Sequence, residues 1–121
     1  MKPLKLYGIP TCGTVRSARK FFKDNDIEIE FIDFKKISVD CDRVDSWIYR
    51  AGLDVLFNNR GTKYRTLKLK ELNLDDDGKR EWLCRENMLF KRPVIEFGDE
   101  VVVSFDEEKY KKIFMKQGSL I

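Results

Sequence analysis

The chain has 121 residues, of which 42% are hydrophobic and 37% are charged. This length fits one compact domain rather than two. The formal net charge is only +3 and the signs alternate along the chain, which argues against a nucleic-acid-binding stripe. Histidine is absent, so zinc sites built on histidine, Ser-His-Asp triads and Cys-His dyads are excluded.

Three cysteines, Cys12, Cys41 and Cys84, are spaced far apart, and none belongs to a CxxC pair. No zinc knuckle fits this spacing, and we expect no metal site. The sequence shows neither a secretory leader pattern nor an apolar run of about 18 residues, which predicts a reduced, cytoplasmic protein. Cys41 and Cys84 fall in or beside predicted helices, where we expect small packing residues rather than resolving thiols.

The N-terminal part of the chain predicts a strand, a helix and a second strand. Leu4–Tyr7 carries apolar side chains at alternate positions and leads into a tight loop. From Thr14 onward, apolar residues recur at helical spacing until a polar break at 24–26. Residues 27–31 alternate between apolar and charged side chains, which indicates a second strand. A β-α-β unit of this kind makes the two strands parallel.

The middle of the chain predicts helices joined by loops. Apolar spacing indicates a helix over 44–51, which Gly52 is expected to cap, with one further turn over 53–57. The polar and weakly periodic region 58–74 is predicted as loop with some helix. Another helix is expected over 79–88, ending before the next proline.

The C-terminal part predicts a hairpin and a last helix. Strands over 94–97 and 101–103 flank a Gly-Asp-Glu turn, and Ser104–Glu107 fits the capping-box pattern at a helix start. Residues 116–121 are expected to form a loose tail. The predicted fold class is α/β: a four-stranded mixed sheet with helices on its faces and a helical insertion between its halves, in a single domain over 1–115.

The loop Gly8–Gly13 lies at the carboxyl end of the first parallel strand, the edge where α/β folds place their sites. Cys12 stands directly before the predicted helix, where the positive end of the helix dipole would favour its thiolate. Free N–H groups around Gly13 and Thr14 would also cradle an oxyanion. The alternative is that Cys12 is only a small residue at a strand–helix turn.

Three segments of the chain resemble the signature blocks of one family. They are Tyr-Gly-Ile-Pro-Thr-Cys-Gly-Thr-Val-Arg-Ser-Ala-Arg at 7–19, Asn-Arg-Gly-Thr-Lys-Tyr-Arg-Thr-Leu at 59–67 and Lys-Arg-Pro-Val-Ile at 91–95. Their order and spacing are similar to those of the ArsC/Spx/YffB family. This resemblance spans nearly the whole chain and implies a thioredoxin-like fold.

The resemblance also implies roles for four residues. In the family's glutathione-dependent arsenate reductases, the cysteine that matches Cys12 attacks arsenate while arginines hold its oxygens. Arg60 and Arg92 match those arginines, and a guanidinium suits the task because it stays charged and binds oxyanions with two hydrogen bonds. Pro93 matches a proline that such folds usually hold in the cis form. Glutathione is implied as a co-substrate rather than a bound cofactor, with glutaredoxin as a candidate partner.

Two features depart from the family's true arsenate reductases. Gly8 stands where those enzymes usually carry a histidine, and no arginine follows Arg92. A glycine at this position is instead similar to the YffB-like branch, whose members are thought to work with glutathione. The departures favour a weaker anion site, so both arsenate and a glutathione-linked thiol substrate stay open.

The spacing of cysteine and arginine residues excludes two other classes of thiol enzyme. A dithiol thioredoxin needs CxxC, and a phosphatase-like arsenate reductase needs Cys-x5-Arg, which Ala18 breaks. The main alternative is an Spx-like regulator that binds the RNA polymerase alpha subunit without catalysis, which is similar in Arg92-Pro93 and in a glycine near Gly52. A catalytically idle domain is also open. We expect a monomer with no nucleic-acid or membrane partner.

Overall fold

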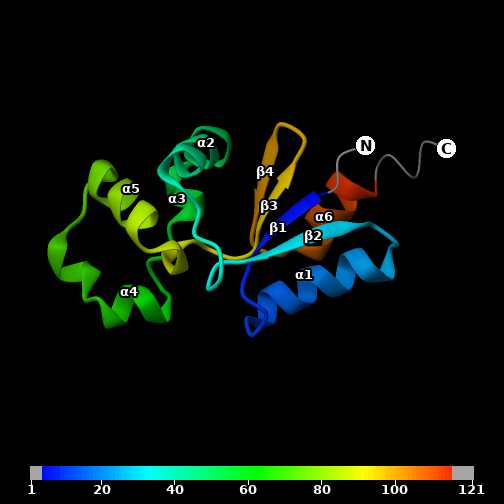
Figure 1. The fold of residues 1–121 in the computed structure, drawn as a ribbon, viewed down its shortest axis with the longest axis horizontal. Helices are drawn as coiled ribbons and strands as arrows, with labels where there is room; N and C mark the ends of the chain where they lie inside the picture. The colour runs from blue at the N-terminus through cyan, green and yellow to red at the C-terminus, as the bar shows by residue number, and fades with distance from the viewer. Residues whose placement is uncertain (1–3, 116–121) are drawn as a thin grey trace.

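The computed structural model describes residues 4–115, and the predicted tail lies outside the described residues. Four strands form one mixed sheet in the order β2-β1-β3-β4 (Figure 1). Strands β1 (Leu4–Gly8) and β2 (Ile29–Asp33) pair in parallel, whereas β3 (Val94–Phe97) runs antiparallel to β1 and to β4 (Glu100–Val103). The predicted α/β fold class and the parallel β-α-β unit are confirmed.

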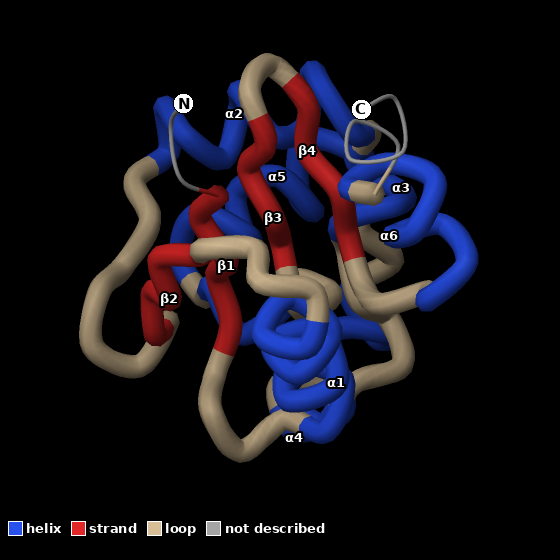
Figure 2. Tube along the Cα trace, turned by 90° about the vertical axis from the view of Figure 1, so that its right-hand side faces the viewer, coloured by secondary structure: helices blue, strands red, loops and turns tan. Residues whose placement is uncertain are grey.

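Helices cover both faces of this sheet. Helices α1 (Gly13–Asp24) and α6 (Glu107–Phe114) pack against one face, and the chain between β2 and β3 packs against the other (Figures 1 and 2). That segment is the predicted helical insertion and contains α2 (Cys41–Ala51), α3 (Leu53–Leu56), α4 (Thr62–Thr66), η1 (Leu69–Leu72), α5 (Asp76–Arg85) and η2 (Asn87–Leu89). Among the described residues, no helix is long and apolar enough to cross a membrane.

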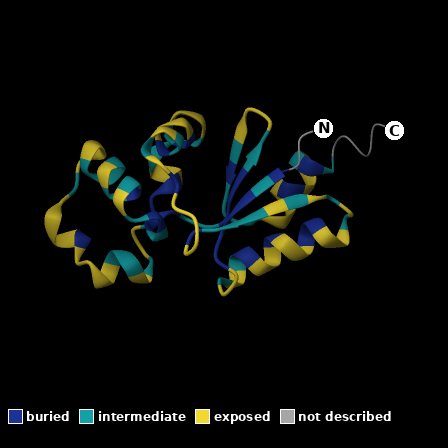
Figure 3. Ribbon diagram, in the orientation of Figure 1, coloured by how far each residue is buried: buried dark blue, intermediate teal, exposed yellow. Residues whose placement is uncertain are grey.

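Alternate side chains of the central strands supply two apolar cores. Leu6 and Ile95 point to one face and pack in a cluster with Phe22 of α1, whereas Val94 points to the other and packs in a cluster with Trp47 of α2. The alternation follows from strand geometry, in which successive side chains face opposite ways. Helix α1 accordingly buries one stripe and exposes the rest (Figure 3). Full burial of each large side chain contributes about 1.5–3 kcal/mol.

The second strand begins later than its alternating pattern indicates. The pattern placed it at 27–31, but β2 begins at Ile29, paired with Leu4. The reason is local: Asp26 adopts φ 55°, and the N–H of Ile27 donates to the carbonyl of Phe22 at 2.9 Å, which closes the end of α1. Ile27 therefore belongs to the turn.

The capping-box prediction for the last helix is wrong. Ser104 has φ 70°, in the left-handed region, and its carbonyl accepts a hydrogen bond from the hydroxyl of Tyr110 at 2.5 Å. Asp106 caps α6 instead, because its carboxylate accepts from the N–H of Lys109 at 3.1 Å. Aspartate is among the preferred helix caps, so two candidates stood close together in the sequence.

Helix α5 starts at Asp76 rather than at the predicted 79. Asp75 caps it by accepting from the N–H of Gly78 at 2.8 Å, and the polar first turn shows no apolar period that could have revealed it. At Gly52 the prediction holds: this glycine caps α2 with φ 99°, a conformation that side chains disfavour.

A partly buried polar cluster joins the helical insertion to the sheet. The carboxylate of Glu96 on β3 accepts hydrogen bonds from Arg43 at 2.8 Å and from the indole N–H of Trp47 at 2.8 Å, both on α2. The hydroxyl of Tyr7 on β1 donates to the same carboxylate at 3.1 Å. Burial, reinforced by the negative charge of Glu96, raises the pKa of Tyr7, so this tyrosine stays neutral. The carboxylate of Glu96 therefore accepts hydrogen bonds from three side chains, one on the sheet and two on α2, and links these two layers.

Replacing Glu96 tests this link. In Glu96→Ala the indole of Trp47 loses its acceptor inside the core, and Arg43 loses its counter-charge. We expect the free energy of unfolding to fall by about 2–3 kcal/mol, measured by urea denaturation. The matched control is Glu100→Ala, at an exposed position of the neighbouring strand, which should change stability by less than about 0.5 kcal/mol. Equal effects of the two substitutions would contradict a structural role for the cluster.

Candidate active site

Cys12 lies where the carboxyl end of β1 meets the start of α1. It is the N-cap residue of α1, with extended backbone angles, and its carbonyl accepts the first helical bond from Arg16 at 3.0 Å. Its N–H donates back to Ile9 at 3.3 Å, which closes the preceding loop. The side chain is partly buried and touches both apolar cores, so the sulfur is held in place while remaining accessible.

The surroundings of Cys12 lower the pKa of its thiol. Partial burial opposes ionisation, but the main-chain N–H groups of Val15 and Thr14 and the positive charge of Arg92 outweigh it. The thiol makes no capping hydrogen bond of its own, so these N–H groups stay available to a thiolate or to an anion beside it. This is the physical situation that favours a nucleophilic cysteine.

Arg92 approaches Cys12 from a different part of the chain. Its guanidinium donates to the carbonyl of Met88 at 3.2 Å and lies 3.6 Å from the Met88 sulfur, while its charge acts on Cys12. The next peptide bond, Arg92–Pro93, is cis, the form that the resemblance implies. Met88 is a site residue that the sequence did not reveal, because nothing in its spacing marks it as an anchor for an arginine.

Arg60 lines a hollow to which neither Cys12 nor Arg92 contributes. Its carbonyl accepts from the guanidinium of Arg65 at 2.7 Å, and the hollow is lined further by Tyr64, Lys68 and Lys70. The structure thus brings Arg92 to Cys12, whereas the hollow around Arg60 holds three further cations and one carboxylate, that of Glu71. A groove with this charge is suited to an anionic group.

Gly8 occupies a position with no room for a side chain. A Cβ atom built on Gly8 would lie 2.7 Å from the Cγ2 of Val15, a buried residue in the first turns of α1. The main-chain carbonyl of Gly8 also accepts from Phe34 at 2.9 Å, which fixes the strand end. The space that a histidine would need here is filled by Val15, so the missing imidazole follows from the packing of α1 on β1.

We expected Cys41 and Cys84 to be small packing residues rather than resolving thiols. The packing part of that expectation is wrong, because the two cysteines are paired with each other. The structure joins them in a disulfide across α2 and α5, with their Cα atoms 5.1 Å apart. Their separation of 43 residues gave no sign of this, because only the packing of the insertion brings the two helices together. Cys12 remains the free cysteine.

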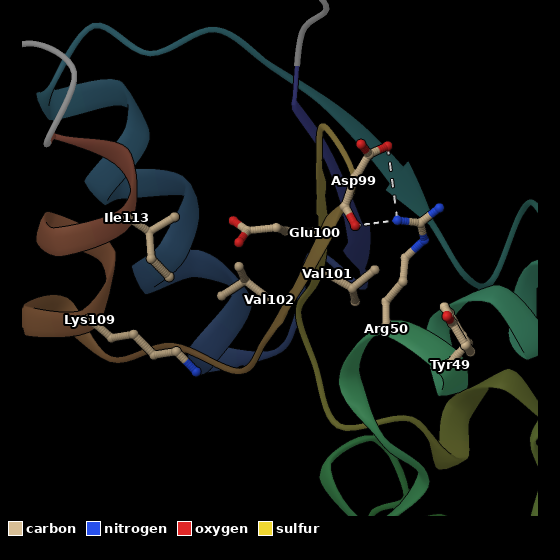
Figure 4. Close-up of a pocket in the computed structure, with 8 residues that line it drawn as sticks. All are labelled: Tyr49, Arg50, Asp99, Glu100, Val101, Val102, Lys109 and Ile113. Carbon is tan, nitrogen blue, oxygen red and sulfur yellow. Dashed lines mark hydrogen bonds and ion pairs between the residues drawn. The ribbon is translucent and has the colours of Figure 1, made fainter.

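A second hollow lies at the open edge of β4 (Figure 4). Tyr49 and Arg50 of α2 form one side, and Lys109 and Ile113 of α6 form the other. Arg50 donates to the main-chain carbonyl of Asp99 and lies 4.0 Å from its carboxylate. No thiol lines this hollow, so it does not share the chemistry of Cys12.

The reactivity of Cys12 tests the electrostatics of the site. Alkylation by iodoacetamide should rise with pH to a plateau, with a midpoint below that of free cysteine, about 8.5, because the site favours the thiolate. Arg92→Ala should move the midpoint upward and slow alkylation severalfold at neutral pH. Arg16→Ala, at an exposed position on α1, is the matched control and should leave the profile unchanged. A wild-type midpoint at or above 8.5 would contradict thiolate stabilisation.

Two glycine substitutions test the packing of α1 on β1. Gly8→Ala should lower the free energy of unfolding by about 1–3 kcal/mol, because the new methyl group meets a stiff, buried valine. Gly13→Ala is the control, since no atom lies within 4 Å of its added Cβ and alanine favours a helix. Thermal unfolding of both variants gives the comparison, and a Gly8→Ala protein as stable as Gly13→Ala would show that the contact can relax freely.

Comparison with known proteins agrees with this architecture. The ArsC family profile matches residues 7–113. YusI of Bacillus subtilis (strain 168) is 34% identical over 113 residues, which cover 90% of this chain and 96% of YusI.

Solved structures show the same fold. A YFFB protein is 28% identical, with a TM-score of 0.83 over 90% of this chain and 96% of its own. An arsenate reductase (ArsC) related protein from Brucella melitensis is 30% identical, with a TM-score of 0.74 over 93% and 95% of the two chains. With its four-stranded mixed sheet and this match over most of its length, the chain belongs to the ArsC family.

Proposed function

We propose that the protein is a monothiol reductase that uses Cys12 as its nucleophile and glutathione as the electron donor. The ArsC family and its structural neighbours support a thiol-based reductase. The observation that carries the proposal is the position of Cys12 at the start of α1 beside Arg92, where its pKa is lowered. The preferred substrate class is a small oxyanion such as arsenate, with a glutathione-linked thiol substrate as the other option.

The geometry supports a simple course for arsenate. The Cys12 thiolate attacks As(V) and a water molecule leaves, while Arg92 and the N–H groups at Thr14 and Val15 balance the negative oxygens. The thiolate of glutathione then joins the Cys12 sulfur in a mixed disulfide. These two sulfurs supply the two electrons that reduce arsenic to As(III). A second thiol, from glutathione or glutaredoxin, releases Cys12 by exchange.

The proposal also assigns roles to Arg60 and Gly13. Arg60 holds a carboxylate of glutathione, since its hollow carries a net positive charge and Cys12 does not line it. Gly13 takes part through its place in the first turn of α1, next to the attacking sulfur. We place the activity in the cytoplasm as a monomer, because glutathione is abundant in that compartment and the reaction needs no second subunit.

Single-turnover mass spectrometry tests the reductase. With arsenate and glutathione, the wild-type protein should carry glutathione on Cys12 and release arsenite, whereas Cys12→Ser should do neither. Arg92→Ala should lower turnover about 10²-fold, as expected for loss of one charged donor to a reacting anion. Arg60→Ala should mainly raise the KM for glutathione, with Arg50→Ala, in the hollow that no thiol lines, as its control.

Two outcomes would redirect the assignment. A mixed disulfide that forms equally fast without arsenate would indicate a general glutathione-linked activity. No turnover at all, together with capture of the RNA polymerase alpha subunit, would indicate the regulator instead.

A further inference from the structure

Cys41 and Cys84 form a second sulfur site, remote from Cys12 in sequence. Cys41 is the first residue of α2 and Cys84 lies in the last turn of α5, and the 5.1 Å between their Cα atoms is within the range of disulfides, about 4.4–6.8 Å. Both cysteines are only partly buried. A small thiol can therefore reach the bond that joins them.

A neighbouring, partly exposed ion pair also joins the two helices. Arg80 on α5 binds the carboxylate of Asp45 on α2 through two hydrogen bonds, each of 2.8 Å. Arg80 precedes Cys84 by four residues and Asp45 follows Cys41 by four, so the ion pair lies one helical turn from the sulfurs on both helices. The ion pair keeps the two thiols near each other when the bond is broken, which favours re-formation of the bond over capture of separate external thiols. A half-exposed ion pair nevertheless fixes the helix ends less firmly than the covalent bond does.

The end of α5 leads directly to the arginine of the active site. Asn87, three residues after Cys84, is buried: its amide donates to the carbonyl of Leu83 at 2.9 Å and its oxygen accepts from the N–H of Val39 at 2.7 Å. The next residue, Met88, holds the guanidinium of Arg92. A bond that fastens α5 to α2 therefore also steadies the anchor of Arg92.

We propose that Cys41 and Cys84 are a reversible redox site, oxidised by glutathione-type disulfides and reduced by glutathione-type thiols, whose disulfide form holds Met88 and Arg92 in place beside Cys12. In oxidation, one cysteine attacks the small disulfide and releases one thiol, and the second cysteine then displaces the other thiol. Two electrons pass from the cysteine pair to the small disulfide, and the two protons leave with the released thiols. Disulfides of proteins in reducing compartments are usually redox-active in this way.

Redox titration in a Cys12→Ser background tests the site itself. Equilibration in mixtures of glutathione and glutathione disulfide, followed by alkylation and peptide mass spectrometry, should show the two cysteines passing together between the dithiol and the cross-linked form. Arg80→Ala should increase the share of mixed disulfides with glutathione. Cysteines that remain free in excess glutathione disulfide, or a bond that resists excess glutathione, would overturn reversibility.

The coupling to Cys12 has its own readout. The alkylation rate of the Cys12 peptide should fall severalfold at neutral pH after reduction by a phosphine, and equally in the double variant Cys41→Ala/Cys84→Ala without reduction. Should the double variant fail to fold, wild-type protein before and after reduction provides the same comparison. An unchanged rate at intact fold would overturn the coupling. None of these measurements uses arsenate, so their failure is separate from failure of the reductase proposal.

Discussion

The close approach of α1 to the end of β1 is the constraint on which the site depends. Gly8 leaves no space between its own backbone and the side chain of Val15, so the helix starts almost directly against the strand end. Cys12 occupies the short connection, where the main-chain N–H groups of Thr14 and Val15 lower the pKa of its thiol. The same contact removes the room for an imidazole, so thiolate stabilisation rests on main-chain groups and one arginine. The contact between Gly8 and Val15 therefore determines both how α1 packs on β1 and which groups stabilise the Cys12 thiolate.

The helical insertion supplies the other half of the site. It is fastened to the sheet by Glu96, which accepts hydrogen bonds from Arg43 and Trp47 on α2. From the same insertion Met88 reaches Arg92 and directs its charge toward Cys12. Met88, several helices away from Cys12 in sequence, therefore holds the arginine whose charge lowers the pKa of Cys12. The disulfide between α2 and α5 belongs to this supporting layer.

Local sequence patterns predicted a strand or helix well where burial of one face gives it a regular apolar spacing. They predicted its bounds less well where a single turn or capping residue sets its start. Alternation located β1, apolar runs on either side of a turn located β3 and β4, and the apolar stripe located α1. The starts of β2, α5 and α6 depended on single turn or cap residues such as Asp75 and Asp106, for which the sequence offers competing candidates. The short helices α4 and η1 have mostly exposed residues, so no period could have shown their bounds.

The sequence by itself determined the fold class, the β-α-β start and the place of Cys12 at a helix N-terminus, because these follow from periodicity within short stretches of chain. The three family-like blocks pointed to Arg92 and Pro93 by their resemblance. Tertiary structure alone decided which arginine lowers the pKa of the Cys12 thiol, that Met88 anchors this arginine and that Cys41 meets Cys84. Those contacts join residues tens of positions apart, and only the packing of the insertion on the sheet brings them together.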